Sequence, residues 1–333
     1  MKNNRYENLF IDFISHTEAT SDDKKIGKRE KLYNDLIRDI ISYAEVFGER
    51  EAIRRFEKSI LDLECPRISY KFSKCFSGAD ILAHEKIILD SGEAEFNYKF
   101  ACDIDGASVN SHESAVVNSG DAQYNYLFAR DIKGANIKLH EKVILDSLNP
   151  IYCYLFARDV KGADIKSLGE AVISSGEADW NYHFASSVKG ADIKAHEKVV
   201  LENGTPFICY LFARDVDGSD NVLLGKKVID SGSAEENYYF ARDIDGADIK
   251  AHEKVVLNSK NPEWNYYFVR CVKGADVDAH KSVIQSSLSL MWIRKFNALI
   301  NQKNEEHNDN YNDVIQYERT KKILEKILSL KKL

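Results

Sequence analysis

Apolar and polar residues follow a helical spacing along most of the chain, and the pattern restarts every 28 residues. In the copy from Gly246 to Lys273, GADIKAHEKVVLNSKNPEWNYYFVRCVK, positions 4, 11 and 12 counted from the glycine make one apolar face, with the mixed position 7 between them. Positions 20, 23, 24 and 27 make a second apolar face, and position 23 is phenylalanine in every full copy. The pattern predicts two helices per unit, a first over positions 4 to 14 and a second over positions 17 to about 27.

Glycine and proline fall at fixed positions of this unit. Position 1 is glycine eight times, from Gly78 to Gly274, and all four prolines stand at position 17. We expect Asp or Asn at position 3 to cap the first helix and proline to begin the second. We expect the glycines at positions 15 and 1 to close the two helices in a left-handed conformation. A fixed period of this size is typical of a solenoid.

The predicted fold class is all-α, a right-handed α-solenoid of about nine two-helix repeats over residues 50–300. Residues 1–49 are predicted to form a helical N-terminal cap, with helices at 2–15 and 29–47. Residues 301–313 are predicted to be a polar linker, and residues 314–333 a basic amphipathic helix. Two alternatives stay open for that helix: it caps the array, or it binds an acidic partner or a membrane surface.

Positions 20 and 7 vary together when one repeat is compared with the next. Where position 20 is asparagine, position 7 of the following repeat, fifteen residues downstream, is histidine. Where position 20 is cysteine, as in Cys153 and Cys209, position 7 is Leu168 or Leu224. The polar pairs are Asn97 with His112, Asn125 with His140, Asn181 with His196, Asn237 with His252, and Asn265 with His280. A buried polar group needs a partner, so the pattern predicts direct contact between the second helix of each repeat and the first helix of the next.

The histidines therefore have two interpretations. One is a series of metal or acid–base sites; the other is a structural inter-repeat ladder of hydrogen-bonded pairs. The joint replacement of both residues by Cys and Leu favours the structural ladder. Metal ligands would also have to converge on one point, whereas these histidines should lie about one repeat apart. The chain contains no GxSxG, HExxH, Walker A or GxGxxG motif. We expect no enzyme, no cofactor and no metal site.

Composition narrows the class of partner and the location. The net charge is −7 with 46 basic residues, which argues against a strongly basic nucleic-acid binder. The six cysteines show neither CxxC nor zinc spacing, so we expect reduced thiols. The first residues lack an apolar signal core, and no stretch is long and apolar enough to span a membrane. We expect a cytoplasmic protein that does not insert into a membrane.

A repeated stripe on the second helix is the candidate partner-binding site. Position 21 is tyrosine in every full copy and position 25 is arginine in five, on one helix face. The candidate residues are Tyr126, Arg130, Tyr154, Arg158, Tyr210, Arg214, Tyr238, Arg242, Tyr266 and Arg270. They stack on bases in one interpretation. In the other, the tyrosine packs between layers, the arginine pairs with a nearby carboxylate, and the variable positions 18, 19 and 22 face a protein partner.

The architecture resembles the α-solenoid class of HEAT and tetratricopeptide arrays, although the period is shorter and the tetratricopeptide signature is absent. The repeated strings GADIKAHEKVVL and YNYLFARD resemble those of uncharacterised bacterial and phage repeat proteins. We expect a non-enzymatic scaffold that binds a partner macromolecule, most simply another protein. Two alternatives remain: a phage-encoded inhibitor of a host defence enzyme such as an RNA-guided nuclease, and a modular reader of RNA or single-stranded nucleic acid.

Overall fold

The computed structural model describes residues 23–302, and every regular element in this part of the chain is helical. The first helices of the repeats are α3 (Glu49–Leu61), α5 (Ile81–Ser91), α7 (Val109–Ser119), α9 (Ile137–Asp146), α11 (Ile165–Ser175), α13 (Ile193–Asn203), α15 (Asn221–Asp230), α17 (Ile249–Asn258) and α19 (Val277–Ser286). The second helices are α4 (Pro66–Cys75), α6 (Ala94–Asp103), α8 (Ala122–Asp131), α10 (Pro150–Asp159), α12 (Ala178–Ser187), α14 (Pro206–Asp215), α16 (Ala234–Asp243) and α18 (Pro262–Cys271). Residues 290–302 form one more second helix, and α2 (Asp23–Phe47) precedes the array.

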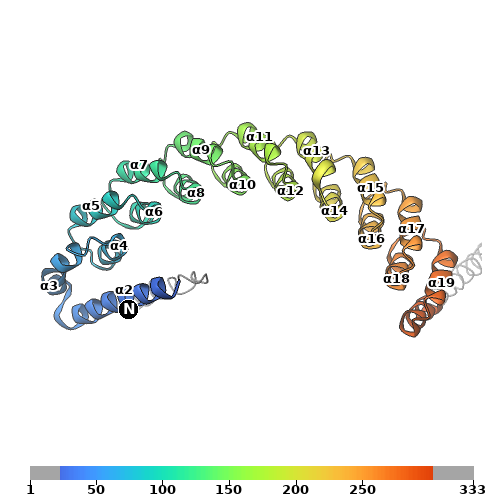
Figure 1. The fold of residues 1–333 in the computed structure, drawn as a ribbon, viewed down its shortest axis with the longest axis horizontal. Helices are drawn as coiled ribbons and strands as arrows, with labels where there is room; N and C mark the ends of the chain where they lie inside the picture. The colour runs from blue at the N-terminus through green and yellow to red at the C-terminus, as the bar shows by residue number, and fades with distance from the viewer. Residues whose placement is uncertain (1–22, 303–333) are drawn as a thin grey trace, which may run out of the picture. The chain divides into compact units, whose positions relative to one another are not determined.

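The described residues fall into two compact units, and the boundary along the sequence lies between Ser175 and Gly176. In the first, α5, α7, α9 and α11 form one row of first helices, and α4, α6, α8 and α10 form a second row beside it (Figure 1). In the second unit, α13, α15, α17 and α19 form one row, and α12, α14, α16 and α18 the other. The most extensive helix contacts in both units join a second helix to the first helix of the next repeat. This confirms the packing predicted from positions 20 and 7, and the fold is an all-α solenoid of helical pairs.

The core of each unit is a stack of identical layers. Phenylalanine at position 23 is fully buried from Phe72 to Phe296, as is the aliphatic residue at position 11 from Ile88 to Ile284. Burying each phenylalanine contributes about 1.5–3 kcal/mol. A ten- or eleven-residue helix is only marginally stable alone, so this stacking supplies the stability that holds the helices.

The first helices begin and end largely as predicted. Asp80, Asp192 and Asp248 accept a hydrogen bond from the backbone N–H three residues on, whereas Asn136 makes no such cap. Position 15 is left-handed in most repeats, even where it is not glycine, as at Leu148 with φ 52°. Gly204 contradicts the prediction: its N–H still donates to the carbonyl of Val200, and it is extended, with φ −73° and ψ 149°. Glycine at this position is therefore neither required for the left-handed turn nor sufficient for it.

The second helices end one residue earlier than predicted. In α8 the helix stops at Asp131, and Ile132 is extended, with φ −91° and ψ 115°. The N–H of Ala135 then donates to the carbonyl of Ile132, and Gly134 lies in that turn with φ 89°. The position-1 glycine is thus the third residue of a β-turn that needs positive φ, and it does not directly close the helix. In six of the seven full repeats this extended residue is buried, as at Val160 and Val216, while Ile132 is partly buried. An apolar residue at position 27 therefore fits the pattern of one more helical residue, although the backbone there is extended.

The N-terminal prediction needs one correction. The helix predicted over residues 29–47 begins at Asp23, six residues earlier. Composition predicts a loop for the polar stretch before residue 29, but lysine, arginine and glutamate are good helix formers, so the helix extends through part of that stretch. The predicted helix at 2–15, most of the linker at 301–313 and the helix at 314–333 lie outside the described residues.

Polar networks and the candidate partner-binding face

The Asn–His pairs are in direct contact between repeats. The Nδ1 atom of His112 lies 2.9 Å from Asn97 Oδ1, and the same contact measures 2.8 Å for His140 with Asn125. In the second unit the distances are 2.7 Å for His196 and for His252 and 2.6 Å for His280. All five predicted contacts are confirmed, and the asparagines and histidines are at most 1% exposed.

The asparagine also closes its own repeat, because in Asn97, Asn125, Asn237 and Asn265 the amide nitrogen donates to two backbone carbonyls. Asn125 Nδ2 lies 2.8 Å from the carbonyl of Val116 in the first helix and 2.8 Å from that of Asp121 at the helix cap. The asparagine oxygen is left as the acceptor, so His140 must carry its proton on Nδ1. In the apolar pairs the thiols of Cys153 and Cys209 point at the equivalent carbonyls, of Ile144 and Val200.

Glutamate at position 8 adds a third contact between repeats, which the sequence did not reveal. Glu113 Oε1 accepts the backbone N–H of Asn136, the cap residue of the next first helix, at 2.5 Å. The same oxygen lies 3.3 Å from Nε2 of His140. The sequence signal was the presence of Glu beside His at positions 7 and 8. Where position 8 is Gly225, a Cβ atom would lie 3.0 Å from the Phe240 ring and 3.5 Å from His252 Nε2, so the next layer occupies that space.

Burial favours the neutral form of these histidines. Desolvation lowers the pKa of His196 and of His252 to about 4, and it lowers the pKa of His140 although the charge of Glu113 opposes the shift. Among residues 23–302, no three His, Cys, Asp or Glu side chains gather as a metal site would require. The geometry is that of a structural ladder, with each histidine used by its own asparagine.

The Tyr–Arg stripe forms a second network, here called the Tyr–Arg–Asp network, which runs between second helices. Tyr126 Oη donates to Asp159 of the next second helix at 2.5 Å, and Arg158 donates to the same carboxylate through Nε and Nη2 at 2.6 and 2.7 Å. Arg158 Nη1 also donates to Tyr154 Oη at 3.1 Å. The same arrangement joins Tyr98 to Asp131 in the first unit, and joins Tyr182 to Asp215 and Tyr210 to Asp243 in the second.

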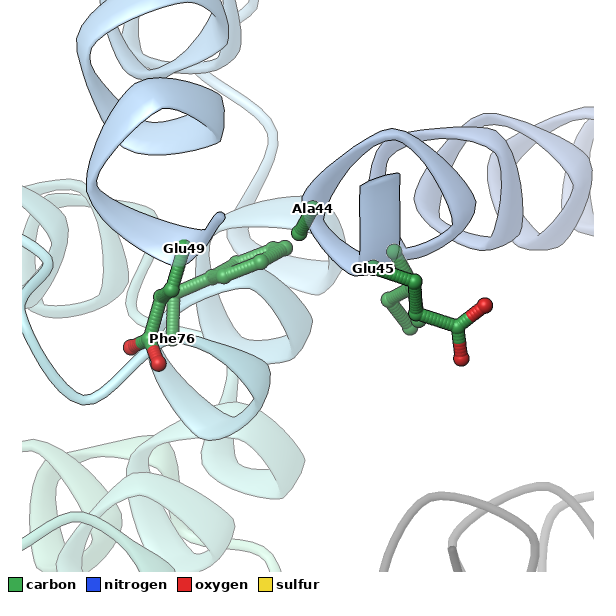
Figure 2. A pocket seen from close by; sticks show the side chains of 5 residues that line it. Ala44, Glu45, Glu49 and Phe76 are labelled. Atoms are coloured by element: carbon green, nitrogen blue, oxygen red, sulfur yellow. The ribbon is translucent and has the colours of Figure 1, made fainter. Parts of the chain in front are cut away.

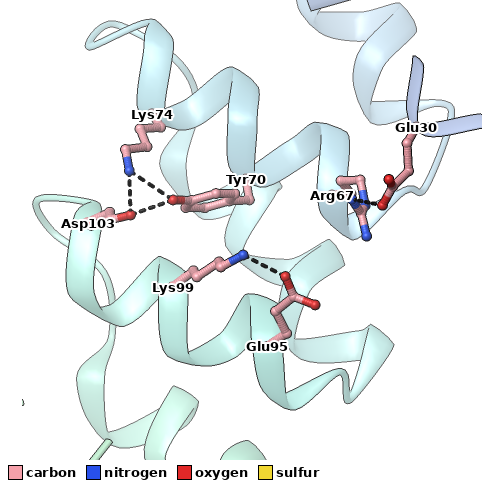
Figure 3. Close-up of polar contacts among 7 residues, drawn as sticks. All are labelled: Glu30, Arg67, Tyr70, Lys74, Glu95, Lys99 and Asp103. Atoms are coloured by element: carbon pink, nitrogen blue, oxygen red, sulfur yellow. Dashed lines mark hydrogen bonds and ion pairs between the residues drawn. The ribbon is translucent and has the colours of Figure 1, made fainter. Parts of the chain in front are cut away.

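Figure 3 shows the first step of this network, where a lysine takes the place of arginine. Tyr70 donates to Asp103, and Lys74 Nζ lies 2.7 Å from Asp103 and 3.0 Å from Tyr70 Oη (Figure 3). Lys74 therefore keeps the network intact in the divergent first repeat. Two further ion pairs in the same view, Arg67 with Glu30 and Lys99 with Glu95, tie α4 to α2 and two turns of α6 together.

The network changes the role of the candidate tyrosines. Tyr126, Tyr154, Tyr210, Tyr238 and Tyr266 are at most 9% exposed. In four of them the arginine four residues on lies over the ring, at 5.1 to 5.2 Å from its centroid. Hydrogen bonding to Arg242 lowers the pKa of Asp243, so the pair is charged at neutral pH. The tyrosine rings are therefore not open for a base to stack on, which leaves the arginines, half-exposed, as the accessible part of the stripe.

Asp243→Ala is expected to lower the free energy of unfolding by about 1–2 kcal/mol, because it leaves Tyr210 and Arg242 without their shared acceptor. Tyr210→Phe is expected to cost less, since the Arg242–Asp243 pair survives. Urea unfolding followed by circular dichroism measures both. Equal losses from the two variants, or none from Asp243→Ala, would contradict a shared carboxylate.

The face that stays open lies on the second helices, at positions 18, 19 and 22. In the first unit it carries Tyr124, Leu127, Tyr152 and Leu155, all partly buried, and Ile151 at 37% exposed. In the second unit it is richer in aromatic rings. The rings of Tyr239, Trp264 and Tyr267 lie on α16 and α18, with centroids 5.9 Å apart for Tyr239 and Trp264 and 6.0 Å for Trp264 and Tyr267.

These three residues, here called the aromatic patch, rest on buried rings and have acidic neighbours. Tyr239 stacks on Tyr210 at 5.7 Å, and Tyr267 lies 5.9 Å from Trp292. Glu235 and Glu263 stand at position 18 of the two helices. Partial burial raises the pKa of Tyr239, and the negative charge of Glu235 raises it further. The sequence identified these positions as variable, but only the structure shows that aromatic residues of adjacent repeats meet there.

A pocket near the N-terminal end of the described residues is a weaker candidate for a binding site. A shallow pocket of about 160 Å³ lies between α2, α3 and α4, lined by Ala44, Glu45, Glu49, Phe76 and Ile41 (Figure 2). Its two carboxylates point away from each other in that view, so no polar groups converge on a small ligand. Within residues 23–302, no helix has the length and apolar character needed to cross a membrane.

Comparison with known proteins adds no family to this description. No protein-family model matches the chain, and neither does any curated protein or any solved structure.

Proposed function

We propose that this protein is a non-enzymatic scaffold that binds another protein through the open face of its second helices. The observation that supports this most is the aromatic patch of Tyr239, Trp264 and Tyr267. Large aromatic side chains of this kind dominate binding at protein interfaces, and here they differ from repeat to repeat. Positions that only support the fold, such as 11 and 23, hardly vary.

The charges around the patch indicate the chemistry of the partner. Glu235 and Glu263 lie beside the rings, and Arg242 and Lys295 already lie over Tyr239 and Trp292. Trp264 has an indole face on which a further cation can bind. We infer that the partner presents a segment with apolar and basic side chains. The same carboxylates repel phosphate groups, which favours a protein over a nucleic acid. All six cysteines are free, which supports a reducing, cytoplasmic location.

The test is affinity purification of the tagged full chain from its own cells, with and without nuclease. The variant pair Tyr239→Ala and Trp264→Ala is expected to lower recovery of a nuclease-resistant partner by about tenfold or more, as loss of central aromatic contacts does. Leu223→Ala on α15 is the matched control, because Leu223 is 48% exposed on the row of first helices. A defence enzyme such as an RNA-guided nuclease would be identified directly in this experiment.

Two results would contradict the proposal. One is a partner whose recovery is unchanged in the Tyr239 and Trp264 variants although circular dichroism shows them folded. The other is co-purifying RNA or DNA with every protein partner lost after nuclease treatment, which would favour the exposed arginines of the Tyr–Arg–Asp network as a nucleic-acid site.

A further inference from the structure

Among the described residues, no first helix follows the second helix formed by residues 290–302, whereas each of the other second helices has such a neighbour. In both units a second helix makes its most extensive contact with the first helix of the next repeat, as α18 does with α19. No described helix follows residue 302. The described part of the array therefore ends on a helix whose partner-facing side is not covered.

The uncovered side is largely apolar; its polar residue is Asn297 at position 24, which is exposed and stands where the full repeats have Ala or Val. Position 20 is 0% exposed in the seven full repeats before it, from Asn97 to Asn265, but Ile293 at this position is only partly buried. Position 17, usually Ala or Pro, is Leu290 at 67% exposed. Ile300 at position 27 is partly exposed as well, and Met291 is 53% exposed. An apolar end of this kind needs a covering element, as the end of any repeat array does.

The pairing rule of this chain says what should cover it. An apolar residue at position 20 is matched by leucine at position 7 of the next helix, as Cys153 is by Leu168 and Cys209 by Leu224. Ile293 is apolar, so its partner should carry leucine where the other helices carry histidine.

The C-terminal segment contains such a helix sequence. In four repeats, positions 7 to 11 read HEKII, HEKVI, HEKVV and HEKVV; these strings begin at His84, His140, His196 and His252. Residues 324–328 read LEKIL. The match keeps Glu at position 8 and Lys at position 9, keeps an apolar pair at positions 10 and 11, and replaces the histidine by leucine. Thr320 then falls on position 3, where a helix cap is needed.

We propose that residues 320–331 form the first helix of one more repeat, which packs on the 290–302 helix and places Leu324 against Ile293. Leu328 then takes position 11, which is 0% exposed from Ile88 to Ile284. Leu324 follows Ile293 by 31 residues instead of 15, so 16 extra residues, largely the polar stretch after residue 302, form the connection. That stretch spans far more than the roughly 10 Å between neighbouring helices. The occupant of this surface is thus the chain's own C-terminal segment.

Hydrogen exchange on the full chain tests the contact. Amides of residues 323–330 are expected to exchange about tenfold or more slowly than in a synthetic peptide of residues 314–333. Leu324→Ala is expected to remove most of that protection, because it deletes a buried side chain. Lys326→Ala is the matched control: position 9 is exposed in the repeats, as at Lys142 and Lys254, so protection should stay.

Replacing both residues of the proposed pair, Ile293 and Leu324, by the Asn–His pair of the other repeats tests whether these two positions face each other. Ile293→Asn alone places an amide opposite Leu324 and is expected to lower protection. Adding Leu324→His rebuilds the Asn–His pair and is expected to restore it, whereas adding Lys326→His is not. Exchange at the free-peptide rate in the wild-type chain would overturn the proposal, and so would equal effects of Leu324→Ala and Lys326→Ala. Protection that rises with protein concentration would overturn it in favour of a second copy.

Discussion

Asn125→Cys or His140→Leu alone is expected to lower the free energy of unfolding by about 1–3 kcal/mol, and the two changes together are expected to cost less than either. Each single change leaves a buried polar group without its hydrogen-bond partner. Without Asn125, the Nδ1 proton of His140 loses its acceptor 2.8 Å away; without His140, Asn125 Oδ1 loses its donor. The double variant removes both groups at once.

The native chain contains the same apolar pair one repeat further on, where Cys153 and Leu168 are both 0% exposed. The Cys153 thiol replaces one asparagine donor by pointing at the carbonyl of Ile144, so the double variant has a structural precedent. Urea unfolding of the wild type, the singles and the double completes the cycle. Additive losses would show that the two positions do not act on each other, and would remove the physical basis of the covariation. Repeat arrays can unfold in parts, so the urea midpoint alone can miss a local effect. Hydrogen exchange of the α8 and α9 backbone amides should therefore be measured as well.

The fold and the Asn–His pairs could be predicted from the sequence, because the repeats of one chain can be aligned with one another. Nine copies show which positions change together, and a fifteen-residue separation links one helix to the next. The helix caps and the left-handed turns followed from residue chemistry at fixed positions. The predicted end of the second helix is one residue late, because a buried apolar residue at position 27, such as Val160, is compatible with helical and with extended backbone.

Only part of the Tyr–Arg–Asp network could be predicted from the sequence. One interpretation of the sequence pairs the arginine with a nearby carboxylate, and Arg158 does bind the adjoining Asp159, but the tyrosine that shares this carboxylate is Tyr126, 33 residues away. Position 21 is tyrosine in every full copy, including those that face Ser187 or Cys271 instead of aspartate, so no covariation marks the contact. The same holds for Glu113, whose bond to the backbone of Asn136 involves no variable side chain. The aromatic patch was missed as a cluster because positions 19 and 22 vary freely, and only packing shows which of their residues meet.

Lowering the pH from 7.5 to 5 is expected to destabilise the array well before its carboxylates titrate. His84, His196 and His252 have pKa values lowered to about 4 by burial, against about 6.5 in an unfolded chain. The unfolded state then binds more protons below pH 6.5, so stability is complete above that pH and falls as the pH drops toward 4. Each such histidine costs about 2 kcal/mol at pH 5. Urea midpoints measured between pH 7.5 and 4.5 give the slope.

The double variant Asn181→Cys with His196→Leu isolates the cause. It removes one of these protonation sites while keeping an apolar pair that the chain already uses, so the pH slope should fall by up to about 1.4 kcal/mol per pH unit. An unchanged slope would assign the acid sensitivity to other groups. The carboxylates of the Tyr–Arg–Asp network are separable, because hydrogen bonds from Arg214 and Arg242 lower the pKa values of Asp215 and Asp243 below the usual 3.8. Their contribution is lost only at more acid pH, so a transition between pH 6.5 and 4.5 reports the buried histidines between repeats.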